Sequence, residues 1–175
     1  PPDLPKEYYC ERPDRFTSRV AKMGGELQRA SGIPIELASL LTLIASEIGD
    51  NSFAHNIGNW PDVSGVFYGY DLAKRVIVLA DRGRGVKTTL QKVRPELNSD
   101  IDALRLAFTE IISGRDPEKR GNGLKVVRRV AEINDQIGLV FRSGIGLVDI
   151  PEPVGQMRVK MSEGNVRGTY AVISF

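Results

Sequence analysis

The chain has 175 residues, of which 41% are hydrophobic and 26% charged, and this fits one domain spanning 1–175 with a substantial core. Its 24 basic and 22 acidic residues leave a net charge of +2, which gives no field to recruit nucleic acid or an anionic membrane. The single cysteine, Cys10, predicts a reducing, cytoplasmic setting. The most apolar stretch, 37–45, is far shorter than the roughly 20 residues that span a bilayer. Because the chain opens with Pro1-Pro2, we expect a domain of a longer protein.

The N-terminal third shows two helical patterns. Apolar residues recur at helical spacing over 14–30, and Pro34 suits the first turn of a second helix that runs to about Asn56. We assign residues 1–35 to an N-terminal helical extension.

A hairpin is expected next. Segments 65–70 and 75–80 are rich in β-branched and aromatic residues, which favour strands. Residues 71–74 would form the turn between these two antiparallel strands.

Residues 86–120 contain no strand pattern and are expected to form a lid with its own helix. Ser99 can cap this helix and Gly114 can end it. Five apolar residues of the helix would face one way: Ile101, Leu104, Phe108, Ile111 and Ile112.

The C-terminal third predicts a helix at 124–133 and then strands at 137–142, 147–150, 157–161 and 169–175, with a turn at 163–165. Helices and strands in this order predict the α/β class, as a two-layer sandwich with helices on one face of a mixed sheet.

The first motif lies on the second predicted helix and includes Glu47, Asp50, Asn51 and His55. Glu47 and Asn51 are four residues apart, so both side chains lie on one helical face and both oxygens can point at one ion. Asn51 is the candidate Mg²⁺ ligand, because Mg²⁺ takes few protein ligands and keeps phosphate oxygens and waters. Taken alone, this motif also fits a solvated helix face.

The second motif follows a strand directly. Asp81 can accept a hydrogen bond from an exocyclic amino group, which would select adenine over guanine. Gly83 and Gly85 allow the backbone to approach a nucleotide closely. An ordinary strand-ending turn is the alternative explanation.

The third motif comprises Gly121, Asn122, Gly123 and Leu124, at the start of the 124–133 helix. Free backbone N–H groups and the helix dipole there favour phosphate, although a plain glycine-rich helix start would look the same. No Walker GxxxxGK[ST] string occurs, and no GxGxxG follows a strand.

The order of these three motifs, with Gly168-Thr169 on a late strand, resembles the GHKL superfamily of gyrase B subunits, heat-shock chaperone ATPases, mismatch-repair ATPases and histidine kinases. The first motif ends with His55, eight residues after Glu47, and in this it is similar to the histidine-kinase and anti-sigma serine-kinase branches. Ala54 replaces the basic residue that is common there. The resemblance covers residues 36–175 and implies a Bergerat-type sandwich with 86–120 as the ATP lid.

The resemblance also implies a role for each matching residue. Glu47 would position or deprotonate the attacking group, and Asn51 would bind Mg²⁺. Asp81 would bind the adenine amino group, and Thr169 would support the adenine through Asp81 or water. The backbone amides of 121–124 would bind the phosphates. His55 would hydrogen-bond the lid or a neighbouring group.

The leading functional hypothesis is an ATP- and magnesium-dependent kinase module of signal transduction. His55 is the only histidine, and it would lie in the nucleotide pocket, so we do not expect it to accept the phosphate. The module would therefore transfer the γ-phosphate to a protein acceptor in trans or on a missing domain. One alternative is an ATP hydrolase with lid gating, and another is a nucleotide-dependent protein-binding module without turnover. The expected partners are ATP and a protein acceptor or regulator, and a homodimer is allowed.

Overall fold

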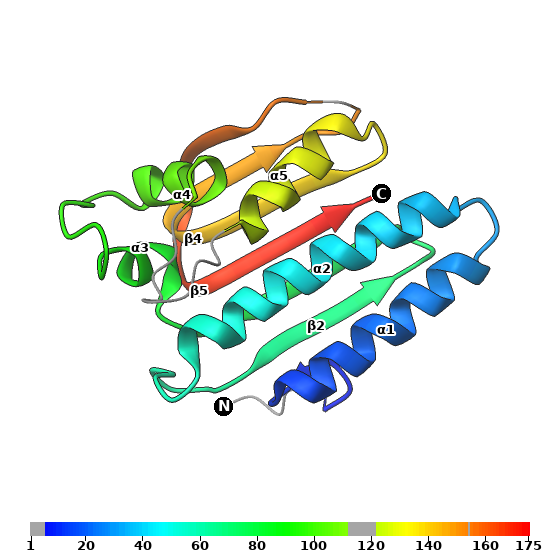
Figure 1. Ribbon diagram of the computed structural model, residues 1–175, viewed down its shortest axis with the longest axis horizontal. Coiled ribbons are helices and arrows are strands. Elements are labelled where there is room, and N and C mark those ends of the chain that lie inside the picture. The colour runs from blue at the N-terminus through cyan, green and yellow to red at the C-terminus, as the bar shows by residue number, and fades with distance from the viewer. Residues whose placement is uncertain (1–5, 112–121, 154) are drawn as a thin grey trace.

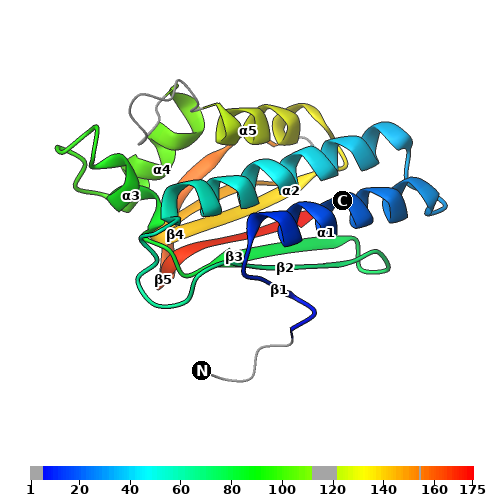
Figure 2. The same cartoon turned by 60° about the horizontal axis from the view of Figure 1, so that its bottom comes forward.

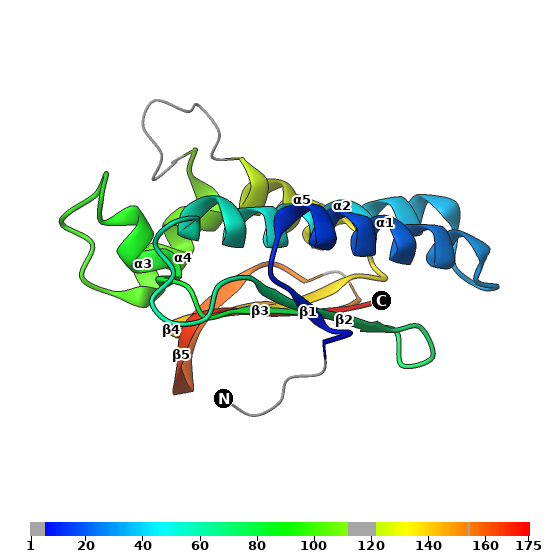
Figure 3. The ribbon, with the colours of Figure 1, turned by 90° about the horizontal axis from the view of Figure 1, so that it is seen from below.

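The computed structural model describes residues 6–111, 122–153 and 155–175. Figure 3, a view along the sheet plane, shows the chain in two layers, with helices on one face of a sheet. The predicted α/β class is confirmed.

The described residues form five strands in the spatial order β1-β2-β3-β5-β4. They are β1 (Tyr9–Cys10), β2 (Val66–Asp71), β3 (Val76–Asp81), β4 (Gly138–Ile150) and β5 (Arg158–Ser174). The expectation of a mixed sheet was wrong, because every pairing in this part of the chain is antiparallel. The helical crossover does bring β4 back parallel to β3, but β5 lies between them and pairs with both.

Five helices accompany the sheet in the described residues: α1 (Pro13–Arg29), α2 (Ile35–Asn56), α3 (Gly85–Leu90), α4 (Asp100–Thr109) and α5 (Gly123–Ile133). Figures 1 and 2 show α1 and α2 side by side along the sheet, with α5 beside α2 on the same face. The two short helices, α3 and α4, lie at the end of the sheet where β3 stops (Figure 2). Helices predicted at 14–30, 34–56 and 124–133 are thus present within two residues of their expected ends.

The predicted hairpin is confirmed, with Asp71 paired to Val76. The Asp71 carboxylate closes the turn by accepting 3.0 Å hydrogen bonds from the backbone N–H groups of Ala73 and Lys74. The sequence did not predict β1 and α3. A two-residue strand and a six-residue helix are too short to show periodicity.

The helix of the expected lid begins as predicted and ends early. Ser99 caps α4 through its hydroxyl, which accepts hydrogen bonds from the N–H groups of Ile101 and Asp102. Leu104 and Phe108 are fully buried, but Ile111 lies beyond the helix and is 74% exposed, so its assignment to the buried face was wrong. The chain has already left helical geometry at Glu110, in extended conformation. Ile112 and Gly114 lie outside the described residues.

The C-terminal strands are longer than expected. Apart from residues 137, 157 and 175, segments 137–142 and 147–150 belong to the single strand β4, and 157–161 and 169–175 belong to β5. The predicted turn at 163–165 was wrong: the chain reverses between Ile150 and Arg158, and 163–165 lie within β5. Irregular pairing opposite 142–146 explains the error, because β5 carries extra residues there and bulges interrupt the alternation of polar and apolar side chains.

Alternation along the strands decides which side chains face the helices. Ile77 and Leu79 of β3 point into the core between the layers, and Asp81 follows them on the same face. On α1, the buried stripe comprises Phe16, Val20, Met23 and Leu27, so α1 shares the core of the sheet. Tyr70 of β2 donates a 2.7 Å hydrogen bond to Glu26 of α1, and burial together with this bond raises the pKa of Tyr70 to about 12.

No helix in the described ranges is both long and apolar enough to cross a membrane.

Candidate functional site

Asp81 is a buried carboxylate at the end of β3, with 3% of its surface exposed. Its Oδ2 accepts hydrogen bonds from Ser52 Oγ of α2, at 2.7 Å, and from Thr169 Oγ1 of β5, at 2.5 Å. Its Oδ1 accepts a 2.7 Å bond from the Gly83 backbone N–H. Thr169 is the direct cross-strand partner of Asp81, so the sheet register brings the two together. The structure therefore brings these two predicted site residues, Asp81 and Thr169, into direct contact.

The loop 83–85 is attached to the end of α2 through Asn56, which is 4% exposed. Asn56 Oδ1 accepts a 3.0 Å hydrogen bond from the Arg84 N–H, and its Nδ2 donates 2.8 Å to the Ser52 carbonyl. A Cβ on Gly83 would stand within 2.5 Å of three atoms of the Asn56 side chain. Glycine at 83 therefore permits this close contact with Asn56.

A second attachment involves Gly85, Gly168 and Ser143. Ser143 Oγ accepts a 2.9 Å bond from the Val86 N–H and donates 2.9 Å to the Gly168 carbonyl. Gly85 has a φ of 77°, and Gly168 has a φ of 79° with its Cα against the Asp81 backbone. Both glycines thus occupy the left-handed region where side chains are strained. The loop 83–85 is held on one side by α2 and on the other by β4 and β5.

The first and third motifs meet where α2 passes the start of α5. A Cβ built on Gly123 would stand 2.5 Å from Glu47 Oε2 and 3.1 Å from Asn51 Nδ2. The side chains of Glu47 and Asn51 are half-buried on the predicted common face of α2. The structure therefore brings this carboxylate and amide against the glycine at the start of a helix.

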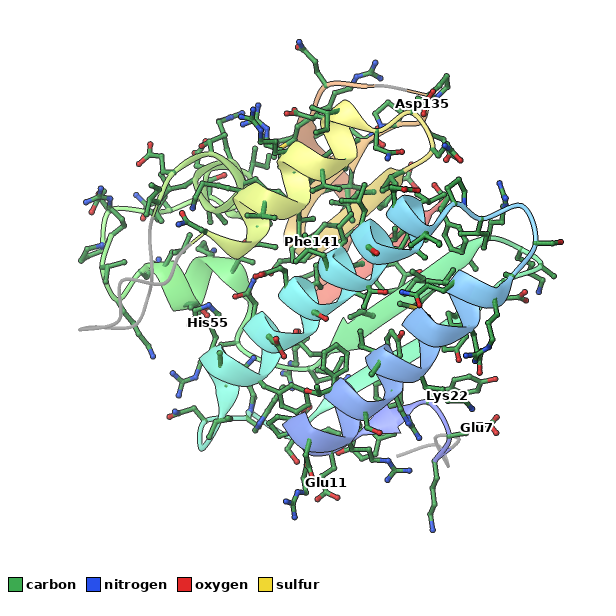
Figure 4. All side chains as sticks on the ribbon, turned by 45° about the vertical axis from the view of Figure 1, so that its right-hand side comes forward. Glu7, Glu11, Lys22, His55, Asp135 and Phe141 are labelled. Carbon is green, nitrogen blue, oxygen red and sulfur yellow. The ribbon has the colours of Figure 1, made fainter. Side chains whose placement is uncertain are left out.

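Of the remaining predicted site residues, Asn122 and Leu124 lie at the start of α5, and His55 lies near the end of α2. Asn122 is exposed and its side chain caps nothing, and Leu124 is half-buried. His55 is half-buried on the last turn of α2, and Figure 4 shows it at the end of that helix nearest the green segment of α3 and α4. Gly121 lies outside the described residues.

Three site residues escaped the sequence analysis: Ser52, Asn56 and Ser143. A signal for two of them was available, because Ser52 and Asn56 continue the apolar stripe of Ile44 and Ile48 at intervals of four residues. Polar residues at core-facing positions of a helix need hydrogen-bond partners, which here are Asp81 and the loop 83–85. Ser143 shows no comparable signal, since it lies at the irregular pairing of β4 and β5.

No group of three or more histidine, cysteine, aspartate or glutamate side chains is arranged to hold a metal ion in the described part of the chain. Comparison with known proteins found no family model and no curated protein that matches this chain.

Proposed function

We propose that this chain is a GHKL-type module with a Bergerat fold that binds ATP with Mg²⁺ and transfers the γ-phosphate to a protein acceptor. The observation that carries the proposal is Asp81, a buried carboxylate held by Ser52, Thr169 and Gly83. A carboxylate has about four acceptor positions, and these three donors occupy three of them. Among the described residues no donor occupies the fourth position, on Oδ1, and the exocyclic amino group of adenine has the required chemistry.

The phosphates would lie between α2 and the start of α5. Glu47 and Asn51 approach Gly123 so closely that a side chain at 123 would collide with Glu47. Backbone N–H groups at the start of a helix of this length attract phosphate oxygens. The Asn51 amide oxygen suits a Mg²⁺ ion that takes its other ligands from phosphate and water, which requires no cluster of protein carboxylates. When bound, the ion would offset the charge of the phosphates.

Transfer to a protein acceptor needs positioning and a base but no covalent nucleophile in this chain. Glu47 is the candidate base, because its carboxylate lies beside Asn51 and faces the start of α5. Hydrolysis would use the same carboxylate on water, so the two reactions differ in the acceptor.

Binding is tested by isothermal titration of ATP with Mg²⁺ into wild type, Asp81→Asn and Asp135→Asn. Asp135 is an exposed aspartate on the loop after α5, well separated from His55 in Figure 4, and serves as the matched control. We expect Asp81→Asn to weaken ATP about tenfold or more, because its amide group cannot accept the same set of hydrogen bonds. Absence of ATP binding by wild type, or equal losses in both variants, would refute the nucleotide site.

Turnover is tested with Glu47→Gln, measured as phosphate release and as transfer to candidate acceptor proteins. We expect the rate to fall about a hundredfold or more while ATP affinity changes little, because the amide keeps the shape but cannot take a proton. Glu11→Gln is the control, since Glu11 is exposed beside α1 (Figure 4). A wild type that binds ATP without release or transfer would favour the nucleotide-dependent binding module instead.

A further inference from the structure

A cavity of about 460 Å³ lies beside the loop 83–85 and shares Gly83 and Gly85 with the predicted nucleotide site. Gly83 and Gly85 form part of its wall, but Glu47, Asn51 and Asp81 do not line it. The opposite wall comes from the irregular stretch of β4 and β5, including Ser143 and Gly168. Its volume lies within the range of small-molecule sites.

Three basic side chains line this cavity: Arg84, Lys87 and Arg167. Arg84 lies in the glycine loop, Lys87 on α3 and Arg167 on β5, so three separate segments each contribute a basic residue to the wall of one cavity. The neutral polar residues Thr88 and Asn165 add hydrogen-bond donors.

Nearby carboxylates compensate only part of this charge. Lys87 Nζ lies 3.4 Å from Asp100 Oδ1, so this pair is neutral. Arg167 Nη1 and Arg82 Nε lie 2.9 Å and 3.1 Å from the same Asp62 Oδ2, so two guanidinium groups share one carboxylate. The hydrogen bond from Arg82 is the main reason that the pKa of Asp62 lies well below its usual range.

Arg84 has no carboxylate partner within ion-pair distance among the described residues. Its Nε donates a 3.3 Å hydrogen bond to the Asn59 carbonyl, which leaves the guanidinium charge uncompensated. Three cations, Arg84, Lys87 and Arg167, and one carboxylate, Asp100, line the cavity, so two positive charges remain. The adjoining ion pair of Asp62 and Arg82 leaves this balance unchanged.

We propose that this cavity is a second binding site, for a compact anion that carries at least two negative charges. Guanidinium groups bind phosphate and carboxylate oxygens in a planar, bidentate geometry, and the two excess charges match a dianion. A phosphate ester and a small dicarboxylate share this chemistry.

The site has a physical connection to Asp81. Ser143 bridges the N–H of Val86 and the carbonyl of Gly168, and Gly168 contacts Asp81 directly. An anion that reorders the loop 83–85 would therefore alter the surroundings of Asp81. The anion site itself depends only on the cavity and its charges, so it stands independently of the proposed nucleotide.

The test is a titration of isotopically labelled protein, free of nucleotide and Mg²⁺, with pyrophosphate and, separately, with succinate, followed by amide NMR spectra. We expect saturable shifts for amides of 83–88, 143–144 and 166–168. Arg84→Gln should weaken binding about tenfold, which is the usual scale for a charge-assisted hydrogen bond. Thr88→Glu replaces a hydroxyl donor on the cavity wall with a negative charge at an exposed position, and should weaken binding at least as much.

Controls separate this site from others. Arg29→Gln changes the net charge equally at an exposed position on the last turn of α1 and should leave affinity unchanged. Asn51→Ala should also leave it unchanged, because Asn51 belongs to the nucleotide site. Tighter binding of pyrophosphate would identify phosphate as the ligand chemistry, and tighter binding of succinate would identify carboxylate. Shifts that never saturate, equal losses in Arg29→Gln, or binding abolished by Asn51→Ala and retained by Thr88→Glu would each overturn the proposal.

Discussion

At the scale of single residues, the site depends on buried polar groups whose partners come from distant parts of the chain. Asp81 is held by Ser52, 29 residues earlier, and by Thr169, 88 residues later. Burying a carboxylate is costly unless hydrogen bonds compensate, and here three donors do so. Glycine is required at 168 for a related reason, because its backbone lies against Asp81 in a left-handed conformation.

Gly168→Ala is predicted to destabilise the protein by about 1–3 kcal/mol or more, because the φ of 79° is strained for alanine and its Cβ would stand 2.2 Å from the Asp81 carbonyl oxygen. Gly164→Ala is the matched control on the same strand, since the nearest atom to its Cβ would be 3.7 Å away. Urea unfolding of both variants measures the difference. Equal stabilities would show that the backbone near 168 relaxes freely.

At the scale of elements, α2 serves the core and the site together. Its buried stripe packs on the sheet, and residues of the same helix, from Glu47 to Asn56, contact Asp81, Gly123 and the loop 83–85. Helix α1 supports α2 from the side, because Phe16 lies directly over Gly49 and contacts the rings of Phe53 and Tyr68. Packing between α1 and α2 therefore helps to position the proposed Mg²⁺ and adenine residues.

Gly49→Ala is predicted to lower the free energy of unfolding by about 1–3 kcal/mol, because the new Cβ would lie 2.0 Å from Phe16 Cζ in a filled core. Gly25→Ala, also inside a helix, should raise it by about 0.5–1 kcal/mol, since alanine favours helix and the nearest atom is the mobile Arg29 guanidinium at 3.4 Å. Thermal unfolding followed by circular dichroism checks both signs. A stabilised Gly49→Ala variant would contradict the close contact.

At the scale of the molecule, the sheet order gathers the motifs at one end. β5 runs between β3 and β4, so Thr169 lies beside Asp81, and the crossover through α5 returns Gly123 to the side of α2 (Figure 1). The first helix belongs to this unit, because four of its buried side chains fill the core under β2.

Deletion of residues 1–33 is predicted to abolish cooperative folding. Phe16, Val20, Met23 and Leu27 are fully buried, and removing them loses roughly 6–12 kcal/mol of stabilisation from burial of apolar surface. This is comparable with the total free energy of unfolding of a domain. The shortened chain should lose its near-ultraviolet circular dichroism and its sigmoidal urea transition. A sharp transition in the shortened chain would show that α1 is a dispensable extension.

Local patterns predicted most of the elements correctly. The stripes of α1, α2 and α5, the Ser99 cap and the hairpin at 71–74 depend on interactions within a few residues, and these are visible in the sequence. The errors occur where long-range strand pairing decides the structure. Residues 163–165, expected to form a turn, instead lie within β5, whose pairing with β4 is bulged. Common placement of Glu47 and Asn51 on one helical face was predictable, but their contact with Gly123 was not.

The amino-acid sequence by itself determined the α/β class, the main helices and the chemical types at the candidate site, because periodicity, caps and motif spacing are local properties of the chain. Only the tertiary structure decided that all strand pairs are antiparallel, that Ser52 and Asn56 hold Asp81 and the loop 83–85, and that Arg84, Lys87 and Arg167 surround one cavity. These contacts join residues far apart in the chain. They depend on sheet order and register, which are set by packing of the whole core.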